Sequence, residues 1–362
     1  MYLFKAILFT LIFLNPLLGK TATNAFNITI IDHNPVYLSL ITTAFNDLTT
    51  AVNSSLPNLD NIGLTKGSAD ASIIASKGLG VDYTNSMKFF LFGWGQGGAI
   101  ALGSAENPLN GIKTIKGLSF VGNFNFGLNL GHLKKKKWMN LPKIWNIDLN
   151  KTKLYFNIMA GSINQKLGGY ELGVDIFSLS VRAMTKIKKA EKFKNYFFKW
   201  GGIDLTSGLE YNKINLTTGI PINKSVTTTD GADTVTTTFD GTLVLGLESK
   251  TLSLPLEISA SAEFFSLLNF YWGLGADVNL GIGSGSGQSN SNVEVKLPAV
   301  PAPIATGKAS LDLGTEESPT IGNLRWFFGL QFNVWKMKTT IGLQHSLING
   351  VWGLGSNFNF IY

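Results

Sequence analysis

Apolar and polar residues alternate along most of this chain. Leu118, Phe120 and Phe124 share one face of such a run, while Ser119 and Asn123 share the other. A period of two is typical of β-strands that have one apolar and one polar face. Several runs are longer than the strands of soluble proteins and match the ~9–11 residues that a tilted strand needs to cross a bilayer.

The pattern predicts twelve antiparallel strands, within a range of about 10–16 that is compatible with transmembrane barrels. The predicted strands are 72–84, 87–103, 117–132, 152–163, 169–184, 201–212, 237–248, 251–264, 269–283, 321–335, 338–347 and 351–362. Two segments leave the number open. The Thr-rich segment 225–238 could form a hairpin of two more strands, and the segment 293–313 could contain another strand.

The composition favours a barrel that faces lipid. Charged residues make up 15% of the chain, whereas roughly 25% is usual in soluble domains. The polar face carries Gly, Asn, Ser and Thr rather than Lys and Glu, and aromatic residues gather near the strand ends, as in the girdles of membrane barrels. A soluble sandwich or lipocalin-like barrel is the alternative. We predict an all-β, transmembrane, antiparallel up-and-down β-barrel over residues 70–362.

The N-terminus has the pattern of a secretory signal peptide, residues 1–25. An apolar stretch over 6–18 follows a basic start and precedes the small residues of Thr23-Asn24-Ala25. We predict cleavage after Ala25, with Ala22 as the alternative. The apolar stretch is shorter than the ~20 residues of a membrane-spanning helix. The chain has no cysteine, which excludes disulfides and thiolate chemistry.

Apolar residues recur at helical spacing between the signal peptide and the first strand. They are Val36, Leu40, Ile41, Phe45, Leu48, Val52 and Leu56. The spacing predicts one short amphipathic helix over 35–56, with Pro35 at its first position after Asn34. Residues 26–69 are thus a helical unit, which is either a periplasmic lead-in or a plug inside the barrel.

The chain ends in a strand with alternating apolar residues. They are Trp352, Leu354, Phe358, Phe360 and Tyr362, with Ser356 as the one interruption. This ending resembles the C-terminal assembly signal of bacterial outer-membrane β-barrel proteins, the porin-like class. The resemblance implies location in the cell outer membrane of a Gram-negative bacterium, with its lipid and lipopolysaccharide as partners. It also implies that the barrel-assembly machinery recognises Phe358, Phe360 and Tyr362.

Two lysine clusters follow predicted strands. They are Lys134, Lys135, Lys136 and Lys137, and then Lys186, Lys188, Lys189, Lys192, Lys194 and Lys199. With twelve strands and both chain ends in the periplasm, the two clusters and the Gly/Ser- and Pro-rich loop 284–320 face outside. Clustered cations attract anions, so this rim could bind lipopolysaccharide phosphates or steer anionic solutes. Solvated charge at the lipid boundary is the other interpretation. We expect loop 284–320 to be exposed.

A few charged residues fall on the predicted lumen face. They are Lys153, Asp204, Glu210, Glu257, Glu263, Asp277 and Arg325. Charges in a channel tune ion selectivity. The alternative is a salt-bridge network that fills a narrow barrel.

Catalytic patterns are not evident. His345 and Ser346 are adjacent, and adjacent strand residues point to opposite faces, so they cannot form a catalytic pair. The glycine-rich segment 93–98 reads as a barrel bend or a patch of small residues on the lumen side. We expect no enzymatic activity, cofactor, metal or nucleic-acid binding. The predicted function is passive or weakly selective passage of small solutes. The alternative is a surface-exposed structural or adhesive protein whose loops bind a ligand.

Overall fold

The computed structural model describes most of the chain after the predicted signal peptide. The described residues are 25–53, 63–102, 115–135, 143–144, 147–148, 151–167, 170–189, 191–192, 198–230, 233–265, 267–289, 292–298, 300, 302–312 and 315–362. Residues 1–24 of the predicted signal peptide, and the predicted rim residues Lys136, Lys137 and Lys194, lie outside this part of the chain.

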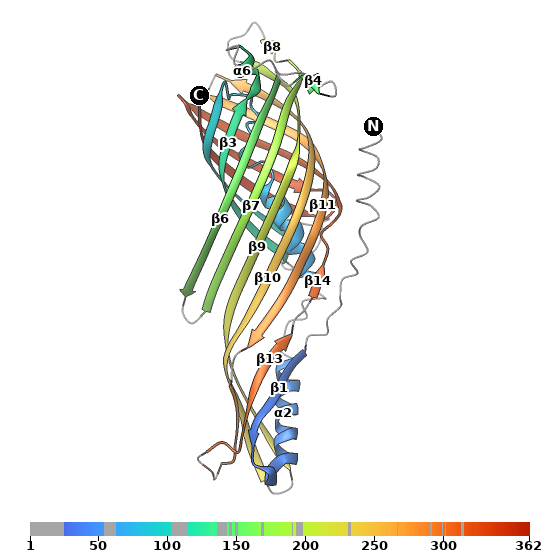
Figure 1. Cartoon of the computed structure of the whole chain (residues 1–362), viewed down its shortest axis with the longest axis vertical. Helices are drawn as coiled ribbons and strands as arrows, with labels where there is room; N and C mark the ends of the chain where they lie inside the picture. The colour runs from blue at the N-terminus through green and yellow to red at the C-terminus, as the bar shows by residue number, and fades with distance from the viewer. Residues whose placement is uncertain are drawn as a thin grey trace.

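Within this part, ten strands form a closed antiparallel ring (Figure 1). In chain order they are β2 (Phe90–Leu102), β3 (Ile115–Asn129), β6 (Thr152–Leu167), β7 (Tyr170–Lys188), β9 (Phe198–Asp230), β10 (Asp233–Phe264), β11 (Leu268–Ser289), β15 (Gly322–Val334), β16 (Met337–Ser346) and β17 (Val351–Ile361). Each strand pairs with the next in this order, and β17 pairs with β2 to close the ring. The predicted up-and-down barrel is confirmed.

Two of the twelve predicted strands are absent from the ring that these residues form. The segment 72–84 belongs to helix α4 (Leu64–Ser76) and the irregular residues after it. It is surrounded by protein, so its alternating residues do not mark two different faces. The segments 237–248 and 251–264 are parts of the single strand β10. The polar pair Ser249 and Lys250 continues this strand because it is paired on both sides, with β9 and β11.

The strands have a polar inner face and an apolar outer face. On β3, Asn123 and Asn125 are buried, while Phe124 between them is 57% exposed. On β11, Asp277 is buried, whereas Leu274 is 66% exposed. This distribution is the reverse of a soluble barrel and is typical of strands that contact lipid. The closed ring also satisfies the backbone hydrogen bonds without water, so the barrel spans the outer membrane.

No helix among the described residues is both long enough and apolar enough to cross a membrane.

The strands β9 and β10 continue far beyond the ring and carry a second folded unit, called the extension below (Figure 1). It consists of the outer parts of β9 and β10, β12 (Asn292–Lys296), β13 (Ala305–Asp312), β1 (Ala25–His33) and helix α2 (Leu38–Asn53). In the sheet, β12 pairs with β10, β13 with β12, and β1 with β13. The Thr-rich segment is therefore the tip of β9 and β10, not an additional hairpin.

The extension has its own hydrophobic core. On α2, Ile41, Phe45 and Leu48 are buried against Phe239 of β10 and Val293 of β12. The predicted loop 284–320 is largely part of this unit and of β11, so the expectation of an exposed loop is wrong. Its Gly/Ser-rich start continues β11, and its later part supplies β12, β13 and the short β14 (Thr315–Glu317).

Helix α2 begins where the sequence predicts. The 3-10 turn Pro35–Tyr37 precedes it, and the Asn34 side chain accepts a hydrogen bond from the Val36 backbone N–H at 3.1 Å. Val36 itself is 81% exposed, so it is not part of the apolar face. Leu56 lies outside the described residues. The helix packs on the extension, and not within the ring.

Candidate functional site

The lumen is occupied by residues 63–89, called the lumen segment below. It begins with α4, which Figure 1 shows inside the ring of strands. At one end of the barrel, the Thr65 hydroxyl donates to Glu317 Oε2 of β14 at 2.8 Å. At the other end, the Phe89 N–H donates to the Tyr362 carbonyl oxygen at 2.6 Å. The segment therefore passes through the barrel from the extension end to the end that holds the C-terminus, called the C-terminal end below.

Glycines on the inner wall let α4 approach the strands closely. A Cβ atom at Gly117 of β3 would overlap backbone atoms of Gly67 and Ser68. A Cβ atom at Gly97 of β2 would overlap the Ala75 carbonyl oxygen. The two backbones thus lie in contact, which only glycine permits. The glycine-rich segment 93–98 accordingly includes a lumen-side position that makes room for a helix.

Lys77 directly follows α4, and its side-chain ammonium group lies in the middle of the barrel. Its Nζ lies 2.8 Å from Glu210 Oε2 of β9 and 3.4 Å from Asp277 Oδ1 of β11. It also donates to the Ser253 hydroxyl at 2.6 Å. All three charged side chains are fully buried. Lys77 of the lumen segment therefore forms ion pairs with two strands of the barrel, β9 and β11.

Two arginines complete the network around Glu257. Arg325 forms an ion pair with Glu257 and holds Asp277 through its Nε at 3.0 Å. Arg182 Nη1 lies 3.5 Å from Glu257 Oε1. The Tyr83 hydroxyl of the lumen segment donates to Glu257 Oε2 at 2.6 Å. Arg182 also forms an ion pair with Glu210, the carboxylate that binds Lys77.

The central network is balanced in charge. It contains three cations and three carboxylates: Lys77, Arg182, Arg325, Glu210, Glu257 and Asp277. Desolvated charges are tolerated only when each has partners. Removing one member would leave an uncompensated charge in the barrel interior, so the network holds the lumen segment in one position.

A second polar cluster lies nearer the C-terminal end. Asp82 of the lumen segment accepts a hydrogen bond from the Met87 N–H at 2.7 Å and lies 3.4 Å from Lys153 Nζ of β6. The Asn85 side chain donates to Asp204 of β9. Asp204 is also 3.5 Å from Lys186 Nζ of β7. This cluster fixes the last residues of the lumen segment before β2 begins.

The seven residues predicted for the lumen face all point inward, and all but Glu263 contact the lumen segment or one another. Six of them are buried: Lys153, Asp204, Glu210, Glu257, Asp277 and Arg325. Glu263 is partly exposed near the C-terminal end, where Lys199 Nζ lies 2.8 Å from its Oε2.

Three residues of the network were not among the sequence candidates. Arg182 lies in phase with the buried polar residues Ser178 and Ser180 of β7, so the period of two could have found it. Lys77 and Tyr83 could not be found in this way, because the alternating pattern of residues 72–84 predicts a strand there.

Lysines surround a cavity of about 370 Å³ at the C-terminal end. Its lining includes Lys151, Lys153, Lys186, Lys189 and Lys199. Three of these are paired with carboxylates. The cavity is the part of the lumen that the lumen segment leaves open to this side, and its excess of positive charge suits small anions.

The two predicted lysine clusters share this end of the barrel. Lys134 and Lys135 belong to the short helix α6 (Leu130–Lys135), which follows β3, and Lys188 is exposed at the end of β7. Lys192 lies in the two-residue strand β8 (Glu191–Lys192). The region 284–320 lies at the extension end, so the expectation that it shares a rim with the lysines is wrong. The error comes from the division of β10 into two predicted strands, which reverses the side assigned to every later connection.

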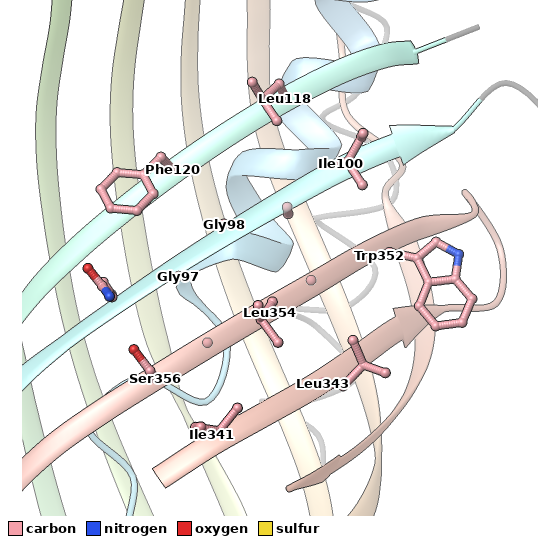
Figure 2. A pocket seen from close by; sticks show the side chains of 14 residues that line it. Gly97, Gly98, Ile100, Leu118, Phe120, Ile341, Leu343, Trp352, Leu354 and Ser356 are labelled. Atoms are coloured by element: carbon pink, nitrogen blue, oxygen red, sulfur yellow. The ribbon is translucent and has the colours of Figure 1, made fainter. Parts of the chain in front are cut away.

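A groove of about 560 Å³ lies on the lipid-facing side where β2 meets β17 (Figure 2). Apolar side chains from four strands border it: Ile100, Leu118, Phe120, Ile341, Leu343, Trp352 and Leu354. Gly98 forms part of its floor, because it has no side chain to fill the outer face. The groove lies over the seam that closes the ring.

The adjacent residues His345 and Ser346 point to opposite faces of β16. The His345 ring stacks on Trp352 with centroids 4.1 Å apart, while Ser346 is buried and donates to Asn323. Among the residues that the structure describes, no group of three or more His, Asp or Glu side chains could hold a metal ion.

The protein-family model described as Lsa36-like matches residues 28–360 of the chain. This match covers nearly the whole sequence, and the chain therefore belongs to the Lsa36-like family. No curated protein matches the chain.

Three solved structures are similar at low scores. The transport unit of the autotransporter AIDA-I from Escherichia coli is 12% identical, with a TM-score of 0.31, over 84% of this chain and 96% of that chain. The translocator domain of the autotransporter NalP from Neisseria meningitidis is 7% identical, with a TM-score of 0.27, over 89% and 98%. CarO from Acinetobacter baumannii is 9% identical, with a TM-score of 0.24, over 74% and 97%. The family match, and not these structures, identifies the chain.

Proposed function

We propose that this protein is a closed outer-membrane anchor that presents the extension to a ligand outside the cell. The observation that carries the proposal is the lumen segment, which occupies the barrel and is held by the balanced network of buried charges. A barrel filled in this way offers little room for solutes. The extension, with a core of its own, is then the part of the molecule that can meet a partner.

The proposed orientation rests on the last strand. Phe358 and Phe360 are exposed on the outer face of β17, which ends at the C-terminal end, and Tyr362 directly after the strand is exposed as well. If the barrel-assembly machinery recognises this strand, it does so from the periplasm. The two-residue turn at 335–336 at this end is typical of the periplasmic side. The extension, on the opposite side, then faces outward.

Cysteine labelling tests the proposed orientation, because the chain has no cysteine of its own. Lys308 is an exposed residue of the extension, and Lys189 is exposed at the C-terminal end. We expect a membrane-impermeant maleimide to label Lys308→Cys on intact cells, and to label Lys189→Cys only after the outer membrane is permeabilised. The reverse pattern would overturn the proposal.

Conductance of the refolded protein in planar bilayers tests the closed lumen. We expect the wild-type protein to give no steady open-channel steps, because residues 63–89 occupy the pore. Steady steps in the wild type, from protein that migrates as a folded barrel, would contradict a closed anchor.

Passage of small anionic solutes is the second candidate function. The lysine-lined cavity at the C-terminal end favours it, since it already forms one open mouth of the lumen. In the proposed orientation this mouth faces the periplasm, on the side away from the lipopolysaccharide of the outer leaflet. Conduction would then require displacement of the lumen segment, so open steps should be rare in the wild type and more frequent when the central network is weakened.

A further inference from the structure

The direction of the chain through the barrel has a consequence for assembly. Strand β2 begins at the C-terminal end, where the Phe90 N–H donates to the Tyr362 carbonyl oxygen at 3.1 Å. The extension, which contains β1 and α2, lies at the opposite end. The only chain between α2 and β2 is residues 54–89. The N-terminal part of the protein is therefore joined to the barrel by a connection that passes through the lumen.

Contacts along the lumen segment follow the barrel axis in order. Near the extension end, the Asp70 carboxylate accepts from the Thr320 N–H at 2.7 Å. Further in, the Ser72 and Thr251 hydroxyl oxygens lie 3.2 Å apart. The contacts of Lys77 and Tyr83 in the central network follow. The segment advances through the pore without turning back.

We propose that the protein carries its own N-terminal segment, residues 26–53, across the outer membrane through its barrel, and that the lumen segment stays behind as the trailing part. This inference rests on the proposed orientation, in which the extension is outside. A chain exported to the periplasm must then move residues 26–53 to the far side of the membrane, while β2 starts on the near side.

The inner wall is fitted to this trailing part at the seam of the barrel. On one side of the seam, Gly97 of β2 lies against the Ala75 carbonyl group. On the other side, the Gln344 side chain of β16 donates to the Ile74 carbonyl oxygen at 2.8 Å, and Asn357 of β17 accepts from the Gly80 N–H at 2.8 Å. The lumen segment thus contacts both β2 and β17, the two strands whose pairing closes the ring. In the proposal, it is in the lumen when β17 pairs with β2.

Two sets of cysteine variants test export through the barrel. Ser39 is exposed on α2, within the exported segment. We expect an impermeant maleimide to label Ser39→Cys on intact cells to the same extent as Lys308→Cys in the extension. The double variant Ser72→Cys/Thr251→Cys should form a disulfide after mild oxidation of outer-membrane fractions, giving a faster band on unreduced denaturing gels that is lost on reduction. The single variants Ser72→Cys and Thr251→Cys are the matched controls and should give no such band.

The outcomes separate the two proposals. Labelling of Lys308→Cys on intact cells without labelling of Ser39→Cys, together with no disulfide band, would overturn export through the barrel and leave the outward extension standing. Labelling of neither variant until permeabilisation would overturn both. Heat-modifiable migration of every variant shows that the barrel has folded, so a negative result cannot be assigned to misfolding.

Discussion

Glu257 is a buried position at which we expect loss of one charge to destabilise the barrel. Its side chain is fully buried between Arg182 and Arg325, and it accepts the Tyr83 hydroxyl at 2.6 Å. We expect Glu257→Gln to keep the size of the side chain and most hydrogen bonds, while it leaves three cations facing two carboxylates. The substitution therefore isolates the loss of charge.

The magnitude follows from the distances. One ion pair at the 3.5 Å that separates Arg182 from Glu257 is worth about 5 kcal/mol at an effective dielectric constant of about 20. Part of this is recovered because Gln is easier to bury than Glu. Breaking a buried pair by removing one partner costs about 3–5 kcal/mol. We therefore expect Glu257→Gln to lower the free energy of unfolding by about 3–5 kcal/mol.

Glu248→Gln is the matched control. Glu248 lies on the same strand, but on its outer face, where it pairs with Lys213 at 3.3 Å and Lys250 at 2.9 Å in a partly exposed cluster. Exposed pairs contribute about 0–1 kcal/mol, so this variant should resemble the wild type. The double variant Glu257→Gln/Arg182→Met restores the charge balance and should be less destabilised than the two single changes added together.

The assay is urea unfolding of the refolded protein in lipid vesicles, followed by tryptophan fluorescence and by heat-modifiable migration on gels. If Glu257→Gln and Glu248→Gln unfold at the same urea concentration, the buried network does not hold the barrel in the way described.

Four further predictions test separate parts of the structure. Deletion of Tyr362 should abolish the heat-modifiable barrel in outer-membrane fractions, and wild-type levels would argue against recognition of the last strand. Leu274→Arg on the lipid face should cost about 2–4 kcal/mol in urea unfolding, whereas Leu274→Met should cost little; equal effects would mean that this position does not face lipid. Gly117→Val should reduce the yield of folded barrel, because the added side chain overlaps α4, and an unchanged yield would mean that the helix does not lie there. In the Glu257→Gln background, where open steps should be more frequent, Lys186→Gln/Lys189→Gln should lower the anion preference in the reversal potential measured at low salt, where charges are least screened; an identical reversal potential would leave this cavity without a role in selectivity.

The barrel itself could be predicted because its signal is repeated and local. Each strand has to place apolar residues toward lipid and polar residues inward, so Phe124 and Asn125 identify their faces without any other information. The start of α2 is equally local, since Asn34 and Pro35 define it. The number of strands was harder to predict. A polar pair such as Ser249 and Lys250 is typical of a turn, and only its pairing with the strands on both sides shows that the strand continues.

The lumen segment could not be predicted from such patterns. Residues 72–84 are buried on every side, so neither a helical nor a strand period separates an inner from an outer face. Leu79, Val81 and Tyr83 happen to alternate, although they belong to an irregular stretch within the barrel. The partners of Lys77 come from strands more than a hundred residues away, and only the ring brings them together.

The small and polar inner face of the strands has a different meaning once the lumen segment is in place. Gly, Asn and Ser facing inward are compatible with a water-filled pore, and they predicted one here. The same residues also suit a wall that holds a helix, because Gly117 allows backbone contact and Asn357 offers a carbonyl oxygen to the Gly80 N–H. A water-filled pore does not require a glycine at a position where a Cβ atom would overlap another backbone. It also does not require a buried acceptor that binds a single backbone N–H. The inner face is therefore specific for the chain that passes through it, and that fit favours an anchor with a threaded segment over an open channel.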